Sequence, residues 1–265
     1  MTKKILLRFS LLLRYIFKDT RYFFWYIWRY FQNNYHNNAK FYADEEFANL
    51  IKAGKSIIRI GDGEIGLTHF FPIRYQIYSD AIKNDLLKII KNYTNDSKYV
   101  LMIPLFVNYT NTQLKKINRF LAFRQIKTTY ELIFNNNATY FDQLIFYKKG
   151  GSEKFIVPHL KNKKVIIVTN KEHTEKIQNS PLASSDYSYI ACNNENTYES
   201  RLAIQNEIIK LITDTGLPKE EFVVLFSTGL AKTIIYDMAE WGYQVLDIGK
   251  GLESYYTNTD IEHTI

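Results

Sequence analysis

The hydrophobic residues of this chain follow two patterns that alternate along its length. Short apolar runs, rich in β-branched residues, predict buried strands at 56–60, 99–103, 164–168, 187–191, 222–226 and 243–248. Longer segments, in which apolar residues recur every three or four positions, predict helices at 41–53, 80–93, 112–123, 138–147, 172–178, 195–214 and 231–241. Strands that alternate with helices in this way are typical of βαβ units and a parallel sheet.

We therefore expect an α/β fold with a Rossmann-like, mostly parallel sheet and flanking helices. An N-terminal amphipathic helical arm precedes this alternation, and the polar segment Gln32–Ala39 after it is typical of a linker. This pattern divides the chain into a basic helical arm over residues 1–40 and a globular domain over residues 41–265.

Charge separates the arm from the globular domain. The 265-residue chain has a formal net charge of +7, and residues 1–40 account for all of it, with eight Lys and Arg side chains against the single acid Asp19. The neutral globular domain argues against a nucleic-acid partner, because nucleic-acid-binding domains carry a basic patch. The single cysteine, Cys192, excludes an internal disulfide and a multi-cysteine zinc site, and it fits a cytoplasmic location.

As a helix, the arm has a basic face and an opposite apolar face. The rings of Trp25, Tyr26 and Trp28 favour a membrane–water interface. The longest charge-free run, Tyr22–Trp28, is too short to span a bilayer, which needs about 20 apolar residues. We expect residues 1–31 to bind an anionic membrane surface, which makes the protein peripheral on the inner face of the cell membrane. Packing on the protein's own body, or a contact between copies in an oligomer, is the alternative.

Candidate chemistry begins where the first predicted strand ends, in Gly61-Asp62-Gly63-Glu64. Ligands of open α/β sheets bind outside the carboxyl ends of the strands. The glycines allow positive φ and close approach of a ligand to the backbone. Two carboxylates one residue apart suit a divalent cation beneath a phosphorylated ligand. Arg59 is suited to pairing with Asp62 or with phosphate, and a solvated acidic turn is the alternative interpretation.

A second turn, Ser227-Thr228-Gly229, joins the strand at 222–226 to the helix at 231–241. Hydroxyls, a glycine and free N–H groups meet there at a helix N-terminus, which favours an anion. The spacing is not that of a Walker A loop, and ordinary helix capping is the alternative. Asp247 ends the last strand. If these strands are parallel, the two turns and Asp247 converge on one crevice, suited to a nucleotide diphosphate bridged by a divalent cation.

These motifs carry a resemblance to a known family. Arg59–Glu64 resembles the Arg-Phe-Gly-Asp-Gly-Glu signature of the bacterial GT-D-type glycosyltransferases, and Leu225–Gly249 resembles their C-terminal block. The matched positions in that block are Tyr236-Asp237, Gly242-Tyr243-Gln244 and Asp247-Ile248-Gly249. The chain departs from the family pattern where Ser227-Thr228-Gly229 replaces Gly-Pro-Thr, Lys250 replaces a His, and Glu253-Ser254-Tyr255-Tyr256 replaces Glu-Tyr-Glu-Trp.

The resemblance implies a Rossmann-like fold and transfer of a hexose-type sugar from a nucleotide-diphosphate sugar, a UDP-sugar. It also implies a divalent metal, Mn²⁺ or Mg²⁺, and a glycan, glycolipid or glycoprotein acceptor in bacterial surface polysaccharide or glycoconjugate synthesis. Asp247 or Glu253 is the candidate general base. The expected catalytic residues are Asp62, Glu64, Asp247 and Glu253, the metal ligands are Asp62 and Glu64, and the donor-binding residues are Gly61, Gly63, Ser227, Thr228, Gly229 and Arg59.

Two other functions compete with this interpretation. Residues 61–66 also satisfy G-x-G-x-x-G, the fingerprint of a dinucleotide-binding oxidoreductase. Two carboxylates inside that turn disfavour it, because they repel a pyrophosphate unless a metal intervenes. The altered second turn keeps open a non-catalytic, membrane-associated scaffold. His69 follows the acidic turn, but a lone His in an apolar segment is more often packed than catalytic.

Overall fold

The computed structural model describes residues 20–69, 73, 76–148, 150–178, 186–193, 195–229 and 231–253 of the chain. Two expectations therefore fall partly outside the described residues. These are the first 19 residues of the helical arm and the segment after Glu253, which includes Ser254, Tyr255 and Tyr256.

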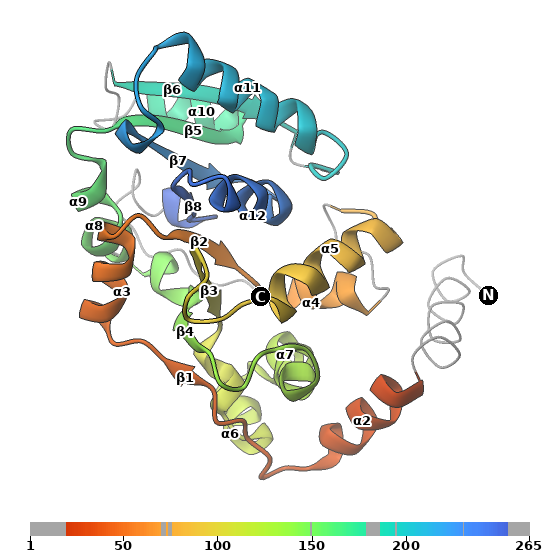
Figure 1. The fold of residues 1–265 in the computed structure, drawn as a ribbon. Coiled ribbons are helices and arrows are strands. Elements are labelled where there is room, and N and C mark those ends of the chain that lie inside the picture. The colour runs from red at the N-terminus through yellow and green to blue at the C-terminus, as the bar shows by residue number, and fades with distance from the viewer. Residues whose placement is uncertain are drawn as a thin grey trace.

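The described strands form one eight-stranded sheet in the order β1-β4-β3-β2-β8-β7-β5-β6 (Figure 1). Every neighbouring pair is parallel, which confirms the expected parallel sheet. The strands are β1 (Lys40–Phe41), β2 (Ser56–Arg59), β3 (Tyr99–Ile103), β4 (Thr139–Asp142), β5 (Lys164–Asn170), β6 (Tyr187–Cys192), β7 (Phe222–Ser227) and β8 (Val245–Asp247).

Helices cover both faces of this sheet, as Figure 1 shows. The α-helices are α2 (Thr20–Phe31), α3 (Asp44–Lys52), α4 (Asp62–Thr68), α5 (Asp80–Lys91), α6 (Asn111–Lys116), α7 (Phe120–Ile133), α8 (Gly151–Phe155), α9 (Val157–Leu160), α10 (Lys171–Gln178), α11 (Arg201–Asp214) and α12 (Lys232–Glu240). Short 3₁₀ helices are η1 (Leu105–Asn108), η2 (Gln143–Tyr147) and η3 (Lys219–Glu221).

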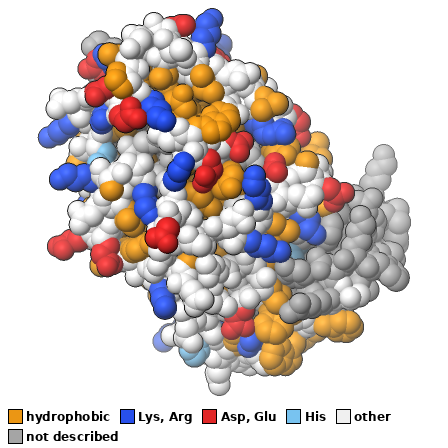
Figure 2. Space-filling view, viewed as in Figure 1, with side chains coloured by type: hydrophobic (Ala, Val, Ile, Leu, Met, Phe, Trp, Pro, Cys, Tyr) orange, Lys and Arg blue, Asp and Glu red, His pale blue; other side chains and the backbone are white. Residues whose placement is uncertain are grey.

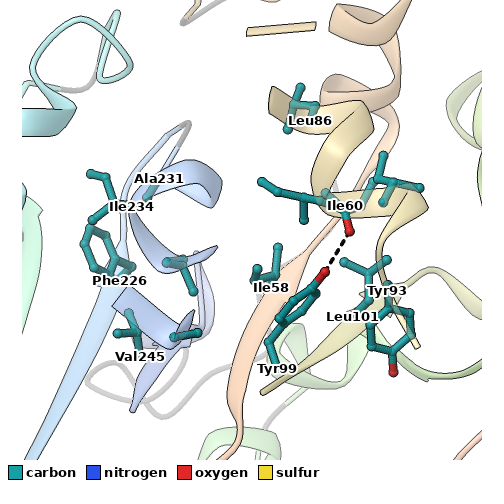
Figure 3. Packing of buried hydrophobic residues seen from close by; sticks show 14 of the residues in the cluster. Ile58, Ile60, Leu86, Tyr93, Tyr99, Leu101, Phe226, Ala231, Ile234 and Val245 are labelled. Carbon is teal, nitrogen blue, oxygen red and sulfur yellow. Dashed lines mark hydrogen bonds between the residues drawn. The ribbon is translucent and has the colours of Figure 1, made fainter. Parts of the chain in front are cut away.

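The core has two layers, because successive strand residues point to opposite faces of the sheet. Ile58, Leu101 and Val224 pack with α5, α7, α11 and α12, whereas Ile57 and Val100 pack with α3, α8, α9 and α10. Figure 3 shows part of the first layer, including Ile58 beside Leu101. The dashed line in Figure 3 marks the hydrogen bond that the Tyr99 hydroxyl donates to the Ile89 carbonyl at 2.8 Å.

Strand register determines where the candidate chemistry gathers. Ile57 of β2 is paired with Leu246 of β8, and Phe226 of β7 is paired with Asp247. The carboxyl ends of β2, β8 and β7 therefore lie side by side at one edge of the sheet. This confirms the expectation that these three strands are parallel.

Two predicted helices are wrong because local patterns conflict with the tertiary structure. Residues 138–147 form β4 and then η2, since Tyr140 and Phe141 are buried on opposite faces of the sheet. A strand buried on both faces shows no polar alternation and is easily mistaken for a helix. Residues 112–123 are split between α6 and α7 at Asn118, whose φ of 55° ends the first helix.

The polar segment 32–39 is packed against the globular domain, contrary to the expected linker. The buried Asn37 side chain donates to the carbonyls of Val107 and Lys127 at 2.8 and 2.9 Å. Helix α2 in turn packs against α7. The division of the chain at residue 40 stays a prediction. Among the described residues, no helix is both long and apolar enough to cross a bilayer.

His69, which follows α4, is a packed residue. Its Nδ1 lies 2.8 Å from the Ile65 carbonyl oxygen and 2.8 Å from the Thr68 hydroxyl. Burial lowers the pKa of His69 to about 4, whereas the pKa of histidine in an unfolded chain is about 6.5. Because the unfolded state binds the proton first, stability is complete above about pH 6.5 and falls between pH 6.5 and 4.

We expect this effect to cost wild-type protein about 3 kcal/mol of unfolding free energy on acidification through that range. Urea unfolding at pH 7.5 and 4.5 measures it, with His69→Gln as the comparison that has no titrating ring. Other groups titrate equally in both proteins, so the difference between their pH slopes isolates His69. Parallel slopes would contradict the prediction.

Candidate functional site

The acidic motif after β2 forms the first turn of helix α4. Gly61 is the N-cap residue, and its N–H donates to Oε2 of Glu64 at 2.9 Å. The expected open turn with positive φ is wrong, because Gly61 has a φ of −103° and Gly63 lies inside the helix. Close approach favours a glycine at position 61 instead, since a Cβ there would lie 3.3 Å from Glu64 Oε2 and 3.4 Å from Gln143 Nε2.

The two carboxylates of the motif differ in environment. Asp62 is exposed at the start of α4, whereas Glu64 is only 7% exposed. Burial of part of the Asp62 carboxyl group, and then the charge of Glu64, raise the pKa of Asp62. Asp62 therefore offers an open ligand position, and Glu64 offers a fixed one. The alternative interpretation, a solvated acidic turn, is therefore wrong for Glu64.

A buried lysine occupies the space beside Glu64. Lys232, the first residue of α12, is 3% exposed, and its Nζ lies 2.5 Å from Asp247 Oδ2 and 3.6 Å from Glu64 Oε1. Asp247 is 1% exposed, at the carboxyl end of β8. Lys232 thereby connects α4, α12 and β8, three elements that are distant in the sequence.

Arg59 completes this group and is directed to Asp247 rather than to Asp62. Its Nε lies 3.3 Å from Asp247 Oδ1, and its backbone N–H donates to Oδ2 at 3.3 Å. Burial alone lowers the pKa of Arg59, but the neighbouring Tyr147, Asp247 and Glu64 raise it above the usual arginine value, so the guanidinium stays charged. We call Arg59, Glu64, Lys232 and Asp247 the ion-pair cluster.

The second predicted turn does not cap its helix. The Ser227 hydroxyl donates to the Gly249 carbonyl at 2.7 Å, and Thr228 Oγ1 lies 3.2 Å from Cys192 Sγ. Helix α12 begins after Ala231, and no described side chain caps it. Within its first turn, Thr233 Oγ1 is buried and has no hydrogen-bond partner among the described residues. Capping by Ser227 or Thr228 is therefore excluded, and the N-terminus of α12 has the properties of an anion site.

The structure brings most of the expected site residues to one edge of the sheet. Glu64, Arg59 and Asp247 meet in the ion-pair cluster, Asp62 adjoins it, and Ser227 and Gly229 precede α12. Glu253 is half-buried in the helical turn that follows β8. The structure adds two residues to the site that the sequence did not predict, Lys232 and Gln143. Lys232 lies within the C-terminal block, but no spacing rule distinguishes it from an exposed helical lysine.

The site fits a metal that binds together with a ligand. Among the described residues, no group of three or more His, Cys, Asp and Glu side chains is arranged to hold a metal ion. Mg²⁺ and similar ions are usually bound by one or two carboxylates, with substrate phosphates and water completing the shell. Asp62 and Glu64 match that donor set. The same geometry disfavours the dinucleotide fingerprint, because Glu64 already occupies the Gly61 N–H that a pyrophosphate needs.

Comparison with known proteins identifies the family. A family model described as Glycosyltransferase GT-D fold matches residues 57–259, which is more than half of the chain. The chain belongs to the GT-D-fold glycosyltransferases. The matched range contains the acidic motif, the ion-pair cluster and the whole C-terminal block, and the predicted family is confirmed.

Solved structures share this GT-D fold. One, described as "A New Glycosyltransferase (DUF1792) from Streptococcus sanguinis", has a TM-score of 0.68 at 18% identity and covers 86% of this chain and 88% of its own. A second, from work stating that domain of unknown function 1792 "has a distinct glycosyltransferase fold", has a TM-score of 0.64 at 22% identity, covering 86% and 85%. Identity at this level establishes the fold alone. No curated protein matches the chain.

Gly249 leaves room for the arginine of this GT-D site, Arg59. Gly249 has a φ of +46°, and a Cβ there would lie 2.0 Å from Arg59 Nη2. We expect Gly249→Ala to displace Arg59 from Asp247 and to lower the free energy of unfolding by about 2–4 kcal/mol, from backbone strain and a steric clash together. Urea unfolding measures the loss.

A matched control separates these two causes. Gly54 also has a positive φ, +89°, but a Cβ there meets nothing within 4 Å. Gly54→Ala therefore reports the backbone strain alone, expected to be about 1 kcal/mol or more. Equal losses in the two variants would show that Arg59 does not depend on Gly249.

Proposed function

We propose that this GT-D-fold protein is a metal-dependent glycosyltransferase that moves a hexose-type sugar from a UDP-sugar to a glycan, glycolipid or glycoprotein acceptor. Its role is the synthesis of bacterial surface polysaccharide or glycoconjugate. One observation carries the proposal. The contact between Glu64 and Lys232 brings the Asp62–Glu64 carboxylates to the uncapped N-terminus of α12.

This juxtaposition supplies both halves of a nucleotide-diphosphate site. The first turn of α12 presents backbone N–H groups and the positive end of the helix dipole to the diphosphate. The Thr233 hydroxyl, which has no hydrogen-bond partner in the described part of the chain, adds a donor within the same turn. Asp62 and Glu64 would hold Mn²⁺ or Mg²⁺, and that ion would supply positive charge to neutralise the diphosphate leaving group.

The turns around these groups define the shape of the donor site. The Ser227 hydroxyl connects its own strand end to Gly249, which keeps the loop over Thr228 and Gly229 close to β8. Gly61 and Gly63 keep the backbone before and within α4 free of side chains. In this proposal Arg59 contributes to donor binding indirectly, because its ion pair holds Asp247 in place.

Glu253 is the stronger of the two candidate general bases. Both Asp247 oxygens are engaged by Arg59 and Lys232, and the side chain is buried. Asp247 therefore cannot reach an acceptor hydroxyl without breaking these ion pairs. Glu253 lies in the helical turn that follows β8, and its side chain is half-buried.

We expect Asp62→Asn and Glu64→Gln each to abolish the Mn²⁺-dependent part of UDP binding, because an amide carries no charge for the cation. Asp62 is exposed, so its replacement should change the free energy of unfolding by no more than about 0.5 kcal/mol. Calorimetric titration with UDP, with and without Mn²⁺, measures the effect. Glu207→Gln, at an exposed acid of α11, is the matched control.

Three outcomes of this titration separate the candidate functions. Metal-dependent UDP binding that survives in both variants would contradict the assignment of the metal ligands. Binding of NAD by wild-type protein would favour the dinucleotide-dependent oxidoreductase. Binding of neither nucleotide would favour the non-catalytic scaffold.

We further propose that the enzyme is cytoplasmic and peripheral on the inner face of the cell membrane, with residues 1–31 on an anionic surface. The contacts that anchor helix α2 to α7 support this proposal. Trp25 Nε1 donates to the Thr128 carbonyl at 3.0 Å, and Arg29 pairs with Glu131 at 2.8 Å. Trp25 therefore faces α7, which corrects its expected place at the membrane interface.

The outer side of α2 carries an apolar stripe at helical spacing. Phe24, Ile27, Trp28 and Phe31 are 67%, 40%, 53% and 71% exposed and lie at positions i, i+3, i+4 and i+7. Figure 2 shows hydrophobic side chains gathered at the lower right, where Figure 1 places α2. An exposed apolar stripe that follows a basic segment is typical of an interfacial helix.

We expect the triple variant Phe24→Ser, Ile27→Ser, Phe31→Ser to bind anionic vesicles at least about 100-fold more weakly, since each buried apolar side chain contributes about 1.5–3 kcal/mol. Trp25 and Arg29 remain, so α2 stays anchored. Vesicle co-sedimentation of the full chain measures the effect. Leu202→Ser, Leu217→Ser, Trp241→Ser removes three exposed apolar side chains elsewhere and is the control. Equal sedimentation of both variants and wild type would favour a contact between copies.

A further inference from the structure

Lys232 lies where its charge is least expected. The N-terminus of a helix is the positive end of its dipole and disfavours a cation. Lysine is almost never buried unless it is paired. Lys232 is nonetheless buried in the first turn of α12, with its ammonium directed to Asp247 and Glu64. The two carboxylates therefore hold a positive charge at the position where the proposed donor brings its own cation.

The two contacts of this ammonium are unequal. Nζ is 2.5 Å from Asp247 Oδ2, within hydrogen-bond distance, but 3.6 Å from Glu64 Oε1. Glu64 is held independently by the Gly61 N–H at its other oxygen, 2.9 Å away. Glu64 can therefore exchange its cation without moving, and Lys232 keeps Asp247 as a partner when that happens.

Charge balance determines when the exchange is favourable. The ion-pair cluster contains two cations, Arg59 and Lys232, and two carboxylates, Glu64 and Asp247. Asp62 adds one more negative charge beside Glu64, so the two charges of a divalent cation exceed the surplus negative charge of the site. A divalent cation arriving alone at Glu64 adds positive charge next to the Lys232 ammonium, and at low dielectric these charges repel strongly. A diphosphate that arrives with the cation offsets that repulsion.

We propose that Lys232 is a resident counter-ion of the donor site, which occupies Glu64 until a metal and a nucleotide diphosphate bind together. Lys232 is a positioning residue in this scheme. It keeps the metal affinity of the free protein low and makes metal binding depend on the nucleotide. The inference rests on the proposed metal-dependent function and adds to it the order in which the charges assemble.

The test compares Mn²⁺ binding by the full chain with and without UDP, read by the electron paramagnetic resonance signal of free Mn²⁺. Lys232→Gln removes the charge and keeps an amide that can donate to Asp247, and Lys232→Met removes both. We expect Mn²⁺ affinity without UDP to rise roughly tenfold in Lys232→Gln, and the gain in Mn²⁺ affinity caused by UDP to shrink by a similar factor. Lys232→Arg, which keeps the charge, should retain the weak affinity of wild type.

Lys210→Met, at an exposed lysine of α11, is the matched control and should bind Mn²⁺ as wild type does. Unchanged or weaker Mn²⁺ binding in folded Lys232→Gln would overturn the proposal and leave a purely structural ion pair, since loss of a structural contact does not raise metal affinity. Circular dichroism establishes that each variant is folded, and Lys232→Gln decides if Lys232→Met is not. Wild-type protein that binds no Mn²⁺ even with UDP would refute the metal-dependent function itself, before any variant is compared.

Discussion

The pairing of Lys232 with Glu64 and Asp247 is the contact on which the geometry of the site depends. It joins the first turn of α4, the first turn of α12 and the end of β8, which no local interaction brings together. Removing one partner from a buried ion pair costs about 3–5 kcal/mol, because the other charge stays buried and unpaired. The cluster therefore fixes the start of α12 against the end of β8, and the Gly61 N–H separately fixes Glu64 beside them.

The sheet places these groups within reach of one another. β2 lies between β3 and β8, so the chain leaves β2 toward one side of the sheet while β8 is reached from the other, through β7. Open α/β sheets bind ligands at such reversals of strand order. Helix α7 links the proposed donor site to the apolar stripe. It contacts both α4, which begins with Asp62, and α2, which carries the stripe.

Sequence reasoning identified the elements that repeat a strong pattern and failed where tertiary contacts override it. The strand at 99–103 was predicted to the residue, and the strand at 56–60 to within one residue. The segment 138–147 was assigned to a helix because its burial on both faces hides the strand pattern. Asn37 appeared to lie in a polar linker, but its hydrogen bonds to Val107 and Lys127 come from residues about 70 and 90 positions away.

The sequence by itself determined the α/β class, the parallel sheet, the Asp62–Glu64 motif and the family, because these follow from periodicity and from residues close together in the chain. Only the tertiary structure decided which charges pair. Arg59 is directed to Asp247, Lys232 is buried beside Glu64, and Trp25 faces α7 while Phe24 and Phe31 face outward. Each of these depends on the packing of elements distant in sequence, and a side chain's exposure and partner are properties of that packing.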